Sequence, residues 1–479
     1  MRSSLRRHLG LLGLAPGKTA AARKRLFVGA QAAPESGPYE SEFSPRDYVS
    51  YLLHVDAEIE HALMVQYLYA AYSLGGPQVP QAHRAAVRGW QEIILGIAKE
   101  EMGHLISVQN ALRLVGSPLN LGREDYPWDV PFYPFPFTLE PLTLDSLAKY
   151  VYAESPEDWT GPLADEVRER VHAQVDDPHR VGELFALLIS LLEDPDYVPD
   201  AAFQANTYPF QASWDEWGRG YAGGARGNAT GANPKPTPDV LVVPLASRDD
   251  AVNAMTQIAQ QGEAPVSADP DAPSHFARFL KIYVEMKACA GQGWSASRPV
   301  AVNPYVSLDP GMDPAEGLAE AETTSAITHP ESRLWATLHN LRYRMLLTYL
   351  THSFTLAGGL AAAGVFTPRG AIVNATFGEM YNLRAISEIL MQLPLGSRAG
   401  VCAGPPFQMP YTLDSPLGEA NRWRLHLDLL DAADRLVAAL LVASPPERHP
   451  YLLSLREADR AMRQTALRIL AGDVNLSLT

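Results

Sequence analysis

A Glu-x-x-His motif at residues 101–104, set inside a long apolar helical repeat, restricts the fold of this chain more than any other feature. Apolar side chains around it recur at steps of three and four residues, which predicts one long core helix; they are Ile93, Ile94, Ile97, Leu105, Val108, Leu112 and Val115. Three residues at about 100° each place Glu101 and His104 on neighbouring rows one turn apart. Both can then hold one metal ion. Because iron or manganese takes about five or six ligands, such a helix needs partner helices.

Composition describes an ordinary globular chain. Hydrophobic residues make up 47% of its 479 residues and charged residues 19%, which is typical of globular domains. No apolar run reaches the eighteen or more residues of a membrane span. The two cysteines, Cys289 and Cys402, are too few for a disulfide framework or a cysteine-rich metal site. We therefore expect a cytoplasmic protein that does not bind membranes.

The charge is unevenly distributed along the chain. Residues 1–25 contain seven Lys or Arg and no acid, so the total of −15 leaves −22 (−15 minus 7) for the rest. This negative charge on residues 26–479 makes nucleic acid an unsuitable partner, since phosphate contacts need clustered positive charge. We interpret the basic head as a flexible tail, with a targeting segment as the alternative.

The periodicity predicts a nearly all-α chain in three parts. Residues 1–43 form a basic flexible tail and arm, residues 44–295 a metal-binding bundle with long loop insertions, and residues 296–479 a C-terminal helical domain. The first helix begins at Ser44-Pro45, a Ser N-cap followed by Pro at the first helical position. Further helices are predicted near residues 81–115, 178–194, 247–261, 275–289, 332–358, 371–393, 419–443 and 451–471. The aromatic-rich and Gly/Pro-rich segments 119–160 and 195–237 are predicted loops.

Acidic and histidine side chains on the other bundle helices complete a candidate ligand set. Glu60 lies among apolar residues of the first helix, where an acid is costly unless it is paired or metal-bound. Glu183 is the candidate on the third helix, although an acid in a first turn is also favoured by the helix dipole. Glu263 and His275 are the candidates on the fourth element. A four-helix di-metal bundle takes one Glu from each of two helices and Glu-x-x-His from the other two. The fourth element departs from this pattern, because a loop separates Glu263 from His275.

Other polar groups compete for a functional role. Tyr67 lies on the same face as Glu60 and could donate a proton at the site, so it is the candidate catalytic residue. An exposed polar stripe is the plainer interpretation of His54, Glu58 and His61, which share another face of the first helix. In the second half of the chain, His339, His352, Glu379 and Glu388 are candidates for a second site. The favoured interpretation is that they are polar residues at the edge of a hydrophobic core.

Several stretches resemble the ferritin-like family named for iminophenyl-pyruvate dimer synthase, which includes violacein-pathway and chromopyrrolate-forming enzymes. They are EIEHALMVQYLYAAYSL (58–74), IAKEEMGHLISVQNALRLVGSPLNL (97–121), HRVGELF (179–185), QGEAP (261–265), SHFARF (274–279), EMYNLRAISEILMQLPLG (379–396) and AGPPF (403–407). The resemblance implies a ferritin-like four-helix bundle plus a C-terminal helical region. The best-known members of this family couple or oxidise amino-acid-derived imines in bacterial secondary metabolism, and they are much longer than this chain.

Together, these observations predict an iron-dependent oxidoreductase acting on a small, amino-acid-derived metabolite. Four carboxylates and two neutral imidazoles would neutralise two ferrous ions, and manganese is an alternative to iron. Two other classes stay open: a ferritin-like metal-binding protein without substrate chemistry, and a metal-free helical scaffold. A homo-oligomer is compatible with each.

Overall fold

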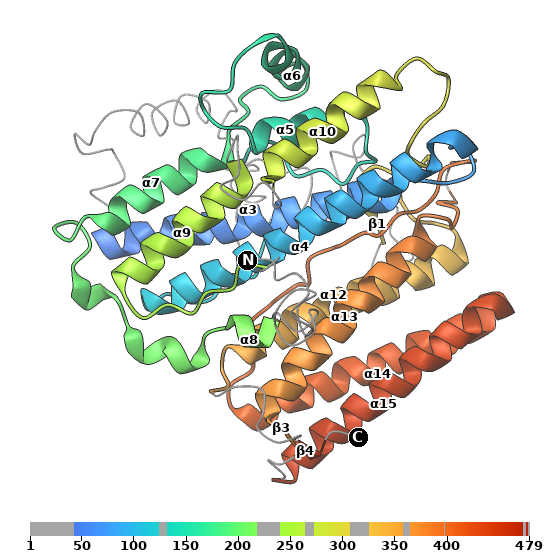
Figure 1. Cartoon of the computed structure of the whole chain (residues 1–479). Helices are drawn as coiled ribbons and strands as arrows, with labels where there is room; N and C mark the ends of the chain where they lie inside the picture. Colours follow the sequence, from blue (N-terminus) through green and yellow to red (C-terminus); the bar gives the residue numbers. More distant parts are fainter. Residues whose placement is uncertain are drawn as a thin grey trace, which may run out of the picture.

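The computed structural model describes most of the chain and is almost entirely helical (Figure 1). The described ranges are 43–123, 132–217, 240–263, 273–306, 325–357, 365–396, 398–472 and 476–477. Residues 1–42 of the predicted tail and arm therefore lie outside the described residues. Within these ranges no helix is both long and apolar enough to cross a membrane. The prediction of an all-α fold is confirmed.

Two long antiparallel helices form the centre of the N-terminal half. Helix α3 (Pro45–Ser73) begins as predicted, with the Ser44 hydroxyl accepting the backbone N–H of Asp47. Helix α4 (Arg84–Leu114) follows a short 3₁₀ turn, η1 (Gln81–His83), and packs along α3. The turn between them uses Gly75 and Gly76, both at positive φ, which glycine adopts without steric cost.

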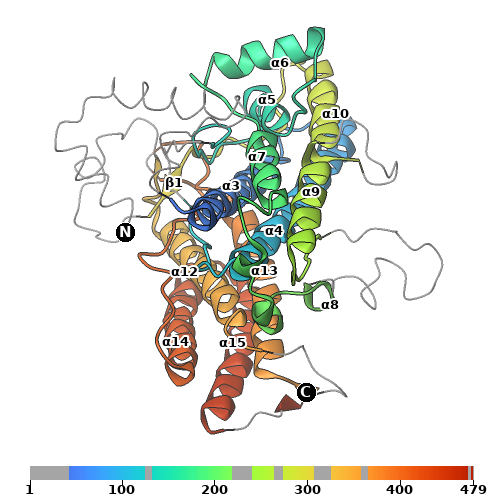
Figure 2. The ribbon, with the colours of Figure 1, turned by 90° about the vertical axis from the view of Figure 1, so that its left-hand side faces the viewer.

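Five shorter helices complete the N-terminal half. They are α5 (Leu144–Ala153), α6 (Pro162–His172), α7 (Val181–Glu193), α9 (Arg248–Glu263) and α10 (His275–Ala288). Helix α7 contacts α3 and α9, while α10 contacts α4 and α5. Helices α7, α9 and α10 thus pack on the central pair of α3 and α4 (Figure 2). The prediction of a loop over residues 119–160 is wrong for α5, which lies inside that range and is capped by Thr143.

Gly103, inside the Glu-x-x-His motif, allows an extended segment to pack on the outside of α4. A Cβ at this position would lie 2.6 Å from Val240 Cγ1 and 3.0 Å from both the N and the O of Leu241. Ser107, one turn further along α4, donates to the Leu241 carbonyl at 2.7 Å. The chain that leads into α9 is thereby fixed to the helix that carries the motif.

Four helices form the C-terminal half, in the orange and red part of Figure 1. They are α12 (Pro330–Ser353), α13 (Pro368–Leu390), α14 (Glu419–Ala443) and α15 (His449–Leu470). The main hydrophobic core runs from the N-terminal helices into α12, where Tyr343, Leu347 and Leu350 belong to it. The domain boundary at residue 295 stays a prediction.

Short elements complete the described structure. Strands β1 and β2 pair in parallel, and β3 and β4 pair antiparallel. The remaining elements are η2 (Asp200–Ala202), η3 (Ala205–Phe210), α8 (Trp214–Trp217), β1 (Pro304–Tyr305), β2 (Ser325–Ala326), β3 (Val365–Phe366), η7 (Pro446–Arg448) and β4 (Leu476–Ser477).

Candidate metal centre

Five buried ligand side chains meet between the N-terminal helices. Glu60 comes from α3, Glu101 and His104 from α4, Glu154 from the residue directly after α5, and His275 from the first residue of α10. None is more than 3% exposed. Groups so polar, gathered away from water, are costly unless they bind a cation or one another.

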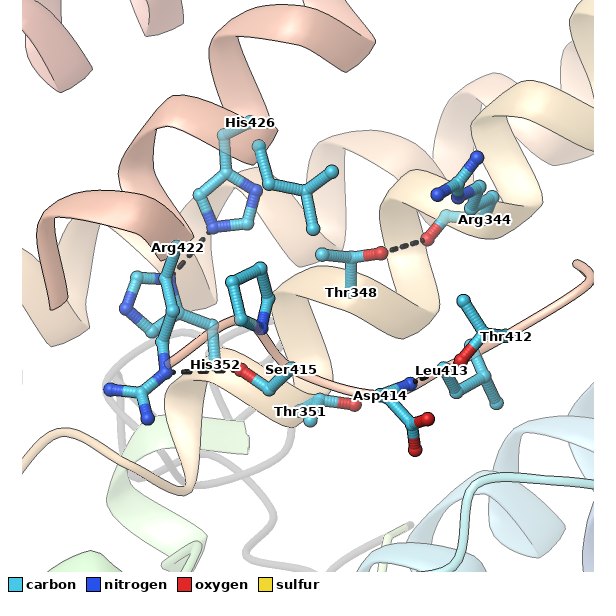
Figure 3. Close-up of a pocket in the computed structure, with 12 residues that line it drawn as sticks. Arg344, Thr348, Thr351, His352, Thr412, Leu413, Asp414, Ser415, Arg422 and His426 are labelled. Carbon is cyan, nitrogen blue, oxygen red and sulfur yellow. Dashed lines mark hydrogen bonds between the residues drawn. The ribbon is translucent and has the colours of Figure 1, made fainter. Parts of the chain in front are cut away.

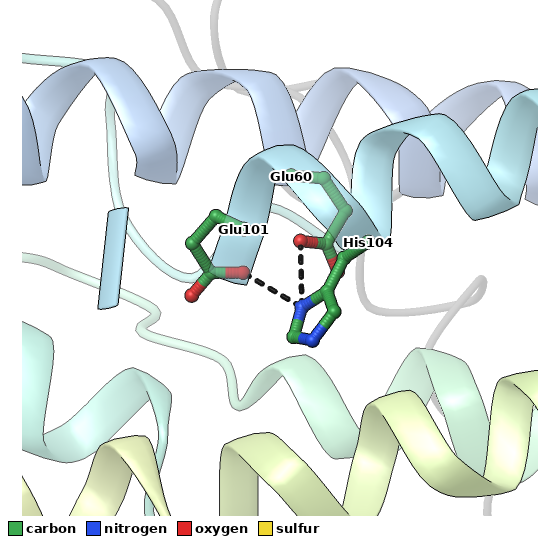
Figure 4. Close-up of side chains that lie close together, drawn as sticks. All are labelled: Glu60, Glu101 and His104. Carbon is green, nitrogen blue, oxygen red and sulfur yellow. Dashed lines mark hydrogen bonds and ion pairs between the residues drawn. The ribbon is translucent and has the colours of Figure 1, made fainter. Parts of the chain in front are cut away.

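These side chains form two groups, each large enough for one metal ion. One is Glu60, Glu101 and His104 (Figure 4), and the other is Glu101, Glu154 and His275; within each group the ligand atoms lie within 4.8 Å of one another. Glu101 belongs to both. One of its oxygens, Oε2, is 2.9 Å from His104 Nδ1, and the other, Oε1, is 2.9 Å from His275 Nδ1. If each group held one ion, Glu101 would be a ligand shared by both.

The far nitrogen of each histidine has its own acceptor. His104 Nε2 is 2.8 Å from Gln261 Oε1, and His275 Nε2 is 3.1 Å from Glu100 Oε2. Arg278 in turn donates to Glu100. An acceptor on Nε2 favours a proton there and leaves the Nδ1 lone pair facing the centre, as is common for metal-binding histidines.

The buried carboxylates and histidines of this centre shift one another's pKa. Burial alone would lower the pKa of His104, but the Glu60 and Glu101 carboxylates raise it to about 10. Burial would likewise raise the pKa of Glu101, yet the two histidines hold it well below its usual range. Metal binding at this site therefore displaces protons and is expected to strengthen with pH.

The residues present fit an iron or manganese centre. Among the described residues, three atoms that border the two groups make ion-pair contacts but no hydrogen bond: Glu60 Oε2, Glu101 Oε1 and His275 Nδ1. Carboxylate oxygen together with imidazole nitrogen suits iron and manganese better than copper(I). The surrounding wall is largely apolar, with Leu63, Val181, Phe185 and Ile258 lining the pocket, so it limits the access of water.

Two further polar residues of α3 lie close to the ligands. The Tyr67 hydroxyl donates to Glu154 Oε1 at 2.6 Å, and burial, together with the charges of Glu154 and Glu101, raises the pKa of Tyr67 well above its ordinary value. Tyr67 therefore keeps its proton and orients a ligand. Asp56, one turn before Glu60, is fully buried, and burial raises its pKa to about 8.

The structure assembles part of the predicted ligand set and alters the rest. Glu60, Glu101, His104 and His275 meet as expected. Glu183 does not: its side chain is 43% exposed and lies 4.0 Å from the His179 ring. The structure therefore does not bring Glu183 into the centre, whereas Glu154, which the sequence argument missed, lies there. Glu263 is the last residue of α9, and its side chain lies outside the described residues.

The rival histidines of α3 make ordinary polar contacts. His54 Nε2 is 3.1 Å from Ser117 Oγ, and Glu58 accepts from the Asn120 side chain. His61 is hydrogen-bonded to the Tyr343 hydroxyl of α12. These contacts tie the helix to its neighbours and do not gather ligands.

The polar residues of the C-terminal half are mostly paired with one another. Glu379 accepts from the buried Arg342 at 2.9 Å. His352 lies between His426, at 2.7 Å, and Glu419, at 2.8 Å. Figure 3 shows His352 and His426 at the wall of a pocket between α12, α14 and the segment 412–416. Neither metal-sized group found in the described part of the chain includes these residues.

Comparisons with known proteins place this centre in context. A family model described as ferritin-like matches residues 53–284. Dichlorochromopyrrolate synthase from Lentzea aerocolonigenes is 28% identical over 407 residues, which cover 76% of this chain and 36% of that protein. The 2-imino-3-(indol-3-yl)propanoate dimerase of Chromobacterium violaceum is 23% identical over 414 residues, covering 79% of this chain and 35% of that protein. The chain thus spans about a third of the length of these relatives. A crystal structure of a ferritin-like protein from Caulobacter vibrioides covers 75% of this chain and 98% of its own, with 18% identity and a TM-score of 0.43.

Proposed function

Since residues 53–284 match a ferritin-like family model, we propose that this protein is a non-haem iron oxidoreductase with a two-ion centre that acts on a small, amino-acid-derived metabolite. The observation that carries the proposal is the position of Glu101. Its two oxygens face two different histidines, and it completes two separate ligand groups. A bridging carboxylate between two ions is the recurring feature of di-iron bundles.

Each buried residue has a role in this proposal. Glu60 and His104 would hold one ion, Glu154 and His275 the other, and Glu101 both. When bound, iron would supply the redox chemistry, including the use of dioxygen. Tyr67 keeps Glu154 oriented through its hydrogen bond. The apolar wall keeps bulk water away, which strengthens every electrostatic interaction inside the centre.

The class of metabolite is suggested by the relatives. Their names refer to a dichlorochromopyrrolate and to an indolyl imino acid, both belonging to those proteins. We propose that the present chain acts on a comparable amino-acid-derived compound in bacterial secondary metabolism, in the cytoplasm, with that small molecule as its partner. Because the chain spans about a third of each relative, the reaction it performs alone need not be the whole one.

Metal content of single-residue variants tests the centre directly. Protein purified with added ferrous iron should contain about two ions per chain. Glu101→Gln should lose both ions because it removes the shared ligand. Glu154→Gln should lose one. Glu183→Gln is the matched control, since that side chain is 43% exposed and outside the centre, and it should keep both.

Three outcomes would contradict the proposal or part of it. If no preparation of the wild-type protein contains metal, the chain is a helical scaffold. If the protein takes up iron but consumes dioxygen only with iron itself and with no indolic or phenylic amino acid-derived imine, it is a metal-binding protein without substrate chemistry. If Glu183→Gln loses iron and Glu154→Gln does not, the ligand assignment on these two helices is wrong.

A further inference from the structure

Asp56 is an acid inside the bundle that the fold itself does not account for. It lies on α3, four residues before Glu60 and therefore on the same helix face. Its side chain is 0% exposed, and neither of its carboxyl oxygens has a hydrogen-bond partner among the described residues. Buried polar groups are almost always hydrogen-bonded, so an exception of this size calls for a functional explanation.

A nearby residue of the same helix shows how this fold treats a purely structural polar group. Gln66 is also buried on α3, at 2% exposed. Its amide nitrogen donates to the Ala62 carbonyl at 3.2 Å, and its amide oxygen accepts from the Thr138 backbone N–H at 3.0 Å. Both ends of that side chain are satisfied. Asp56 receives no such support, although it carries the more demanding group.

The neighbours that Asp56 does have belong to one half of the metal centre. The charged groups that act on it are His104 and Glu101, which with Glu60 form the first ligand group. Asp56 is not a member of either metal-sized group, so it stands behind the ligands.

We propose that Asp56 is an outer carboxylate of the metal centre, stabilising the ion held by Glu60, Glu101 and His104 without being one of its ligands. This inference rests on the proposed function, because it requires an ion at that position. A cation there would place a further positive charge near this buried acid. Outer groups of this kind hold ligands in place, and their removal commonly weakens metal binding about 10- to 100-fold.

The role of Asp56 can be tested without any enzymatic reaction by measuring how Mn²⁺ binds to the metal-free protein. Isothermal titration calorimetry gives the affinities, and electron paramagnetic resonance gives the concentration of free ion. The variant is Asp56→Asn, which keeps the shape and removes the charge. We expect one of two ions to bind about 10- to 100-fold more weakly and the other to keep its affinity. The control is Asp47→Asn, which removes a charge from an exposed position on the same helix and should leave both affinities unchanged.

A structural role would give a different result. If Asp56 only supported the fold, Asp56→Asn would lower the urea midpoint of the metal-free protein. The proposal expects that midpoint to be unchanged, because Asp56 makes no hydrogen bond in the described structure that Asn would lose. Two ions bound with unchanged affinity by Asp56→Asn would overturn the inference and leave the proposed function standing. No Mn²⁺ or Fe²⁺ bound by the wild type would overturn the proposed function, and the inference with it.

Discussion

His339 should make the stability of the metal-free protein depend on pH between 7.5 and 5. It is fully buried on α12, with its ring edge-on to Phe407 at 4.5 Å and its Nε2 3.3 Å from Ser387 Oγ. Burial lowers its pKa from 6.5 to about 3. The folded state therefore keeps the ring neutral at pH 5, while the unfolded chain binds a proton. Stability from this group is present above pH 6.5 and is lost as the pH falls towards 3.

The size of the effect follows from that shift. At pH 5 the pH lies 1.5 units below the pKa of 6.5 in the unfolded chain, so protonation stabilises the unfolded state by about 2 kcal/mol at 1.36 kcal/mol per unit. In His339→Gln this loss should be absent. Urea titrations of both proteins at pH 7.5 and 5, with metal removed, should show the wild type losing about 2 kcal/mol more than the variant. His172→Gln, at an exposed position, should behave like the wild type. Equal losses in wild type and His339→Gln would refute the reasoning.

Three other substitutions test the packing and polar contacts. Gly103→Ala should lower the free energy of unfolding by about 1–3 kcal/mol, because its Cβ would clash with the packed segment after residue 239. Gly89→Ala on the same helix is the control: its Cβ would meet nothing within 4 Å, so it should be neutral or stabilising by up to about 1 kcal/mol. Urea midpoints of the two variants give the comparison. Tyr67→Phe removes the hydrogen bond to a ligand and should weaken the binding of one Mn²⁺ by about tenfold or more in calorimetry. Arg342→Met leaves Glu379 and a second buried acid without their cation and should cost about 3–5 kcal/mol, read as a lowered melting temperature; a smaller loss than about 1 kcal/mol would show that these acids are protonated in the folded protein.

The central helices and their ligands could be predicted because the information is local. The cap at Ser44, the glycines after residue 74 and the apolar period of α3 and α4 fix where these helices begin and end. Within a helix, spacing alone determines which side chains share a face. Glu101 and His104 are therefore paired by geometry. Glu60 is assigned by the same argument, as an acid on an apolar face.

The third helix shows where such an argument needs tertiary structure. The residues of α7 that line the pocket are Val181 and Phe185, four residues apart. Glu183 is two residues from each, about 200° around the helix, and so faces outward. The apolar period of α7 contains that signal. Nothing local marks Glu154, because it follows a short helix inside an aromatic-rich segment and reaches the centre only when α5 packs on α10.

The C-terminal helices bear on the metal centre through α3. Glu60 and His61 are consecutive, about 100° apart, so one faces the ligands while the other faces α12. The Tyr343 hydroxyl of α12 accepts from the buried Arg123 at 3.2 Å, which leaves its proton for His61. Burial lowers the pKa of His61 to about 3, so its ring is neutral and can accept that proton. The rotation of α3 about its axis is thus fixed by α12 on one side and must suit the ligand geometry on the other. The contacts that orient this part of α3 therefore come from both halves of the chain, and the main core contains residues of both.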